Sequence, residues 1–380
     1  MGTSNSSPAF KIINGSKWAY LKRSTGRNVL CQEDAYDLFE KIEKKSRVDF
    51  QSLYVHKQLM GLSSNTGGFN NLINRFSAHK RKLKLEGGEV EYLIYDGDVL
   101  LTRLSIDWDH HKKKKAGMGL YTIRKGDRNS FSADPVKKIT TIHAAVNGIA
   151  KNIEDATEFM PDFINYGYPE SQLDSKALHT LFYNPYNGRI DADWKCMQDS
   201  SGIAGGTQAA KKLAAVIEIA AREKRAINWT IHERGCAIFK QALRLVNPSP
   251  QYDYSTQTVF YANSLVNVEL IDQHRERLGM KLSAGGALVN GFSVHQGLVA
   301  GNWVSEPALI WKMGNKGKAM SVAGARGKKI TGVATASLAT KAVVLPALAG
   351  AAPWAMGLIA LLGTNLFAQY SNRGIINNNG

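Results

Sequence analysis

The sequence predicts an α/β fold in which a mostly parallel sheet carries helices on both faces. An α+β region precedes this sheet, and a hydrophobic helical tail follows it. Three observations lead to the prediction. Residues 136–300 alternate between short apolar runs and helical stretches, which is typical of parallel sheets. Residues 1–130 combine a helical stretch with a β-hairpin pattern, and residues 342–372 contain no charged side chain.

The elements are expected in this order. The first region should contain a helix around 34–45 and a hairpin that turns at Asp96-Gly97, because Asp-Gly favours tight hairpin turns. Residues 130–135 read as a linker. The second region should contain strands at 138–146, 177–183, 227–231, 258–265 and 289–294, and helices at 153–160, 207–224 and 236–245. We therefore expect a domain at 136–306, a basic Gly/Ala-rich tract at 307–341 and a hydrophobic segment at 342–372.

The charge of the chain is concentrated near its end. The 380 residues include 48 Lys+Arg and 32 Asp+Glu, which gives a net charge of +16. No acidic residue follows Glu306. About 20 apolar residues suffice to span a bilayer, so 342–372 is long enough for a transmembrane helix. Lys328, Lys329 and Lys341 would then bind anionic lipid head groups. A helical hairpin buried inside the fold is the alternative for this segment.

Composition narrows the function classes. Apolar residues make up 44% of the chain, which excludes wholesale disorder. The 3 cysteines are too few for a disulfide framework or a cysteine zinc site, and we expect no metal and no cofactor. The basic cluster at 110–115 lacks interleaved aromatic residues, which argues against nucleic acid as the partner. Residues 1–13 lack the apolar run of a secretory signal.

One segment carries the pattern of a catalytic turn. The apolar run that ends at Ile231 meets His232-Glu233-Arg234-Gly235, and an apolar helix follows. This strand–turn–helix pattern is that of a nucleophile elbow, in which a sharp turn lifts one side chain above the sheet. Glu233 occupies the central position, and the start of the following helix favours its negative charge.

Residues 138–300 resemble the α/β-hydrolase superfamily, and more narrowly the lipase-like domains of bacterial toxins and secreted effectors. Three segments carry this resemblance in the expected order: 141–149 as the strand and oxyanion loop, 179–185 as the next strand, and 232–235 as the elbow. The resemblance implies that Asn147, Gly148, Ile149 and Arg234 line the site that binds substrate and oxyanion.

The elbow departs from the family pattern because glutamate replaces the nucleophilic serine, and Ser–His acyl transfer cannot proceed through it. Three explanations remain open. The domain is a pseudoenzyme; or Glu233 attacks as a carboxylate, as an aspartate does in dehalogenases of this fold; or Ser293 or Cys236 is the nucleophile instead.

An active elbow also needs an acid and a histidine downstream. Asp272 and His295 are the best-placed pair, with Asp253 and His274 as alternates.

The sequence therefore predicts a membrane-associated, lipase-like effector or toxin of bacterial or phage type, with a degenerate or atypical esterase site. The alternative is a non-enzymatic protein that inserts into membranes or forms pores and uses the same scaffold for binding. In both cases membrane lipids are the expected partner, with a protein partner or a homo-oligomer as further possibilities.

Overall fold

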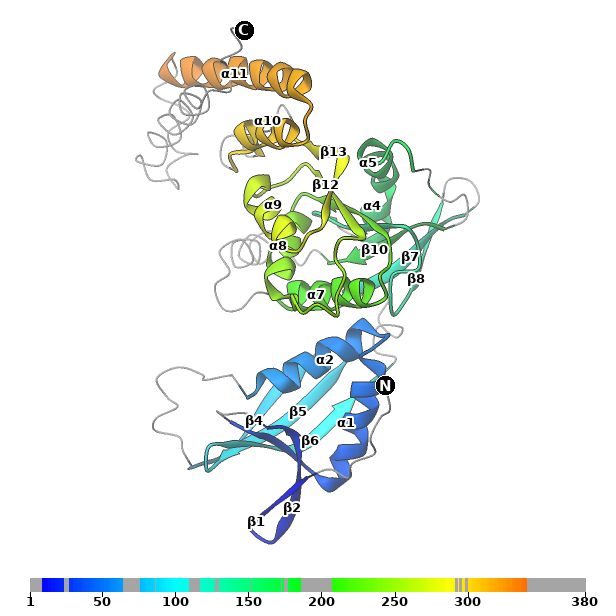
Figure 1. Ribbon diagram of the computed structural model, residues 1–380, viewed down its shortest axis with the longest axis vertical. Helices are drawn as coiled ribbons and strands as arrows, with labels where there is room; N and C mark the ends of the chain where they lie inside the picture. The colour runs from blue at the N-terminus through cyan, green and yellow to red at the C-terminus, as the bar shows by residue number, and fades with distance from the viewer. Residues whose placement is uncertain are drawn as a thin grey trace.

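A computed structural model shows how the chain folds (Figure 1). The residues that it describes are 9–23, 27–63, 76–85, 87–108, 117–126, 130–150, 152–171, 173, 177–185, 207–290, 293, 296–297 and 300–339. The basic cluster at 110–115, His295, Lys341 and the hydrophobic segment 342–372 lie outside these residues.

The N-terminal unit is a six-stranded mixed sheet with the strand order β1-β2-β3-β6-β5-β4. Its elements are β1 (Phe10–Ile13), β2 (Ser16–Lys22), β3 (Val29–Gln32), α1 (Glu33–Lys45), α2 (Phe50–Gly61), β4 (Phe76–Leu85), β5 (Gly88–Tyr95) and β6 (Asp98–Ile106). The predicted helix and hairpin are confirmed. Asp96 and Gly97 have φ angles of 47° and 82°, and this left-handed pair suits the twist of the hairpin.

The second unit is built on a seven-stranded sheet with the order β13-β12-β11-β9-β10-β7-β8. Its strands are β7 (Gly119–Lys125), β8 (Phe131–Pro135), β9 (His143–Val146), β10 (Ala177–Tyr183), β11 (Ile227–His232), β12 (Gln257–Ala262) and β13 (Lys281–Leu288). Strands β9 to β13 pair in parallel, whereas β7 and β8 are antiparallel additions at one edge. The sheet is therefore mixed.

Helices cover both faces of this sheet, as the sequence predicts (Figure 1). They are α4 (Ile153–Glu158), α5 (Met160–Gly167), α7 (Gln208–Arg222), α8 (Gly235–Leu245) and α9 (Val268–Arg277). Successive strand residues point to opposite faces. Ala144 and Val146 accordingly join the core beneath α7, α8 and α9, while Ala145 joins the separate core beneath α4 and α5. The α/β architecture is confirmed.

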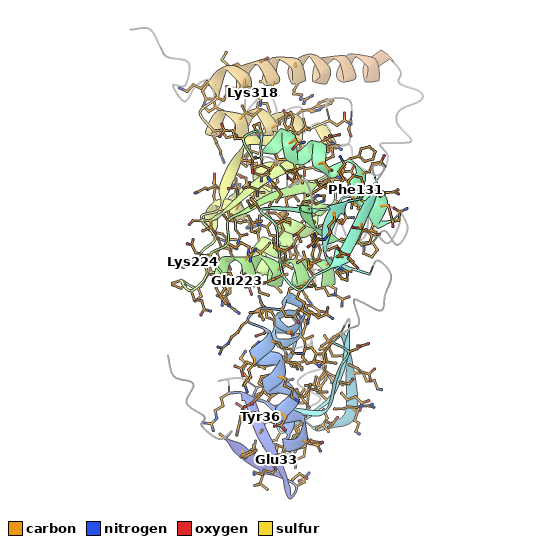
Figure 2. All side chains as sticks on the ribbon, turned by 90° about the vertical axis from the view of Figure 1, so that its right-hand side faces the viewer. Glu33, Tyr36, Phe131, Glu223, Lys224 and Lys318 are labelled. Carbon is orange, nitrogen blue, oxygen red and sulfur yellow. The ribbon has the colours of Figure 1, made fainter. Side chains whose placement is uncertain are left out.

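The predicted boundary between the two units is wrong. β7 and β8 pair with each other and with β10, so residues 119–135 belong to the second sheet and not to the N-terminal region. The expected linker at 130–135 is strand β8, whose Phe131 is labelled in Figure 2. None of the five residues of β8 is buried at this sheet edge, so its sequence carries little apolar signal.

The last strand is also misplaced by the sequence prediction. β13 occupies 281–288, whereas the apolar pattern indicated 289–294. A Cβ atom on Gly285 would lie 2.8 Å from the Cα atom of Gly167 and 3.0 Å from the carbonyl oxygen of Tyr166. Helix α5 therefore packs against bare backbone, and the strand needs a glycine where the sequence pattern would expect an apolar side chain.

Helices fill most of the tract predicted at 307–341, and the first of them begins before it. The tract contains the second half of α10 (Asn302–Lys312) and all of α11 (Lys316–Ala339), so the expected boundary at 306 falls inside a helix. A buried ion pair joins the two helices, with Arg326 Nη2 2.8 Å from Glu306 Oε2. The backbone of Val289, just after β13, bonds to both side chains. Among the described helices, none is long and apolar enough to cross a bilayer.

The two units share one continuous core. Phe50 and Leu53 of α2 belong to the same buried cluster as Leu213 and Ile217 of α7. Helix α2 lies directly against α7, at the junction between the two sheets in Figure 1.

Candidate functional site

The segment around Glu233 has the predicted strand–turn–helix geometry. Strand β11 ends at His232, Glu233 and Arg234 form the turn, and α8 begins at Gly235. Glu233 has a φ angle of 46°, a left-handed conformation that is strained for a residue with a side chain. Its amide nitrogen donates to the carbonyl oxygen of Ala262 at the end of β12 (2.9 Å), which holds the strained residue in place.

Gly235 explains why this turn can lie so close to the neighbouring strand. A Cβ atom at position 235 would lie 2.8 Å from the carbonyl oxygens of Val146 and Asn147, at the end of β9. Any larger residue would push the elbow away from β9. The glycine therefore brings the end of β9 and the elbow together.

The loop after β9 contacts the elbow through its backbone. The amide nitrogen of Ile149 donates to Glu233 Oε2 over 3.2 Å. A Cβ atom on Gly148 would lie 2.6 Å from the same oxygen, so the carboxylate packs directly on the glycine backbone. The predicted oxyanion loop and Glu233 are thus brought together, and the backbone N–H of Ile149 binds the carboxylate of the chain itself.

Asn147 fixes the orientation of this loop and is almost fully buried. Its side-chain oxygen accepts from the amide nitrogen of Asn184 (2.7 Å), and its side-chain nitrogen donates to the carbonyl oxygens of Asn184 and Gly148 (3.0 Å each). The carbonyl of Gly148 belongs to the same peptide group as the N–H of Ile149. Asn147 therefore positions the N–H of Ile149 and does not itself face an oxyanion.

His232 is the residue that the sequence interpretation missed. Its ring stacks on Phe163 of α5, with 4.7 Å between ring centroids, and its Nε2 atom lies 4.0 Å from Glu233 Oε1. Burial lowers the pKa of His232, and the nearby Glu233 carboxylate partly opposes this shift. The imidazole next to Glu233 is therefore neutral near pH 7. In the sequence, the position of His232 directly before Glu233 is the one feature that could have pointed to it.

The predicted acid–histidine pair is not supported at Asp272. This residue lies on α9 with a fully buried side chain, and both of its carboxylate oxygens bind the guanidinium of Arg275 (2.5 and 3.1 Å). The same guanidinium donates to the carbonyl oxygen of Met280. Asp272 is thus engaged in a buried ion pair with Arg275. His295 lies outside the described residues.

The other nucleophile and acid candidates also have local structural roles. The thiol of Cys236 is buried and donates to the carbonyl oxygen of Ile231. Ser293 Oγ accepts from the amide nitrogen of Gln296, and Asp253 accepts from Ser255 in a turn. Burial and nearby basic residues of α8 and α9 lower the pKa of His274. None of these contacts reaches Glu233. Arg234, which was predicted to line the substrate site, is half-buried and immediately precedes α8.

In the described part of the chain, no group of three or more His, Cys, Asp or Glu side chains could hold a metal ion. Of the residues predicted to bind lipid, Lys328 and Lys329 lie on α11.

Comparison with known proteins gives no further guide to the activity. No protein-family model, curated protein or solved structure matches this chain. The resemblance to α/β-hydrolases therefore stays a prediction that rests on the residues and geometry described above.

Proposed function

We propose that this chain is a membrane-associated protein whose second unit is a degenerate α/β-hydrolase-like domain. An elbow with a left-handed central residue, between a parallel strand and a helix, supports the relationship. So does the loop after the adjacent strand β9, which directs a backbone N–H toward that residue.

The hydrogen bond from Ile149 to Glu233 is the main observation in favour of a lost acyl-transfer activity. A hydrolase uses such an N–H to stabilise the oxyanion that develops in the transition state. Here a carboxylate of the protein already binds that N–H at 3.2 Å. Its negative charge would also repel an approaching oxyanion. With glutamate in place of serine and Asp272 paired with Arg275, the described residues around the elbow supply neither the serine nor the unpaired acid of a Ser–His–Asp site, which supports the proposal.

The charge of the C-terminal part supports binding to anionic lipid. No acidic residue follows Glu306, while α11 carries Lys316, Lys318 and Arg326 before the two lysines at 328–329. Arg326 is occupied by Glu306, but Lys316 and Lys318 are exposed. Each basic residue near an anionic membrane contributes about 1 kcal/mol of binding free energy. We therefore propose that membrane lipids are the partner of this end of the protein.

Two assays on the full-length protein test the proposal. Ester and phospholipid hydrolysis should be absent from wild type and from Glu233→Ser, because Asp272 is engaged by Arg275 in both. Turnover by wild type that disappears in Glu233→Gln would instead support a carboxylate nucleophile and contradict the proposal that the hydrolase site is degenerate.

Sedimentation with vesicles tests the lipid partner. Wild type should bind anionic vesicles and lose binding as the salt concentration rises. Equal binding to neutral vesicles would contradict the electrostatic part of the proposal.

A further inference from the structure

The contact between Glu233 and Ile149 has the form of a bound ligand. One carboxylate oxygen accepts the backbone N–H of Ile149, and the other lies 4.0 Å from the Nε2 atom of His232. The carboxylate packs on Gly148, where even one added methyl group would clash with it. The Glu233 side chain is 26% exposed, so the site opens to solvent on one side.

The protein side of this contact is organised independently of Glu233. Asn147 is buried and holds the peptide group between Gly148 and Ile149 by its carbonyl, as described above. Its two bonds to the backbone of Asn184 anchor it to the end of β10. His232 is likewise held by its stacking on Phe163. Removing the Glu233 side chain should therefore leave the N–H and the imidazole in place.

We infer that the elbow is a binding site for small monocarboxylates and that the side chain of Glu233 is its built-in occupant. This inference rests on the proposed role of the elbow and specifies its ligand. A monocarboxylate can present one oxygen to Ile149 and the other toward His232, as Glu233 does. In wild type the tethered carboxylate excludes free ligand, because the tether gives it a high effective concentration.

Acetate titration of Glu233→Gly tests the inference. Glycine suits the left-handed φ angle of position 233, so this variant removes the carboxylate without adding strain. The amide resonance of Ile149 should shift saturably with acetate in the millimolar range, and no such shift should occur in wild type. Glu233→Gln should also resist acetate, because glutamine keeps an acceptor on the same N–H.

Asp96→Gly is the matched control. Asp96 is also an acidic residue with a left-handed φ angle, 47°, and it lies in the hairpin turn of the N-terminal unit. The control loses the same charge and the same strain but keeps Glu233 on the N–H of Ile149, so it should show no acetate-dependent shift at Ile149. If Glu233→Gly does not fold, Glu233→Ala provides the same readout.

An unchanged Ile149 resonance in both Glu233→Gly and Glu233→Ala would overturn the inference. A response to chloride equal to that to acetate would also overturn it, because the site would then lack carboxylate specificity. Ester hydrolysis by wild type would contradict the proposed function. It would not affect the expectation that Glu233→Gly binds acetate. Failure of acetate to bind would leave the absence of turnover untouched, so the two proposals can fail separately.

Discussion

The Nζ atom of Lys57 lies 2.6 Å from the carboxylate of Glu218 and so joins the two units of the protein. Lys57 lies on α2 of the N-terminal unit, and Glu218 lies on α7 beneath the second sheet. The Glu218 side chain is only 1% exposed and also accepts the amide nitrogen of Asn247 (2.7 Å). A buried carboxylate without its cation is costly, so this pair makes the junction sensitive to substitution.

Replacing Lys57 by methionine should destabilise the whole protein. The substitution keeps most of the apolar stem but leaves Glu218 buried without its cation, which should lower the free energy of unfolding by about 3 kcal/mol. Urea unfolding measures this change. Lys44→Met is the matched control, because Lys44 pairs with Glu40 on the surface of α1 and its side chain is 76% exposed. The control should change stability by less than about 1 kcal/mol, and equal effects would contradict the account.

Gly285→Ala should separate α5 from β13. The added methyl group would lie 2.8 Å from the backbone of Gly167, so the helix or the strand must shift, at a cost of about 1–3 kcal/mol. Gly317→Ala is the control, because nothing lies within 4 Å of the added atom on α11. That change should stabilise the helix by about 0.5–1 kcal/mol. Thermal unfolding of both variants gives the comparison, and a neutral Gly285→Ala would refute the close contact.

His179 should make the fold sensitive to acid. It is fully buried on β10 and, within the described residues, neither ring nitrogen has a hydrogen-bond partner. Burial, with a smaller contribution from the neighbouring His143, lowers the pKa of His179 from 6.5 to about 3. The unfolded chain therefore binds the proton more readily, and stability present above pH 6.5 is lost as the pH falls toward 3.

Each unit of pKa shift corresponds to about 1.4 kcal/mol, so His179 should account for several kcal/mol of this loss. Urea unfolding between these pH values measures it for wild type and His179→Leu. The leucine variant should show a distinctly shallower decline in stability with acid. Parallel curves for the two proteins would show that His179 is accessible to solvent or has a partner.

Arg326→Met should release α11 from α10. Arg326 binds the buried Glu306 and the carbonyl oxygen of Val289, so its loss leaves a buried carboxylate uncompensated. Amide hydrogen exchange along α11 should accelerate while exchange in the central strands stays constant. Lys318→Met serves as the control. Lys318 is an exposed residue near the start of α11 and is labelled in Figure 2. Unchanged exchange in Arg326→Met would exclude the ion pair as the anchor.

Much of the second unit follows from sequence pattern because its elements are strongly apolar or periodic. The strand at 177–183 and the helices at 207–224 and 236–245 agree with β10, α7 and α8 within two residues. The sequence pattern did not predict β8, because none of its residues is buried, and it misplaced β13, because only part of that strand is apolar and buried. Helix α9 was not expected, because it carries six charged or histidine side chains in ten residues.

The candidate site was predictable only in part. The elbow follows from local pattern, since an apolar strand runs into a glycine-containing turn and an apolar helix. The ion pair of Asp272 with Arg275, three residues later on α9, can be expected only once that segment is known to be helical. The bond between Ile149 and Glu233 spans 84 residues and has no local signal in the sequence.

Hydrogen exchange at the amide of Ile149 tests the central claim most directly. If the Glu233 carboxylate occupies this N–H, Glu233→Gly should accelerate exchange at Ile149 by about tenfold or more, because a hydrogen bond to a charged group contributes about 1.5–3 kcal/mol. In Glu233→Gly, exchange in β11 should stay at the wild-type rate. In the Asp96→Gly control, exchange at Ile149 should also stay at the wild-type rate. Equal exchange at Ile149 in wild type and Glu233→Gly would show that the elbow is open, and the account of a closed carboxylate site would be wrong.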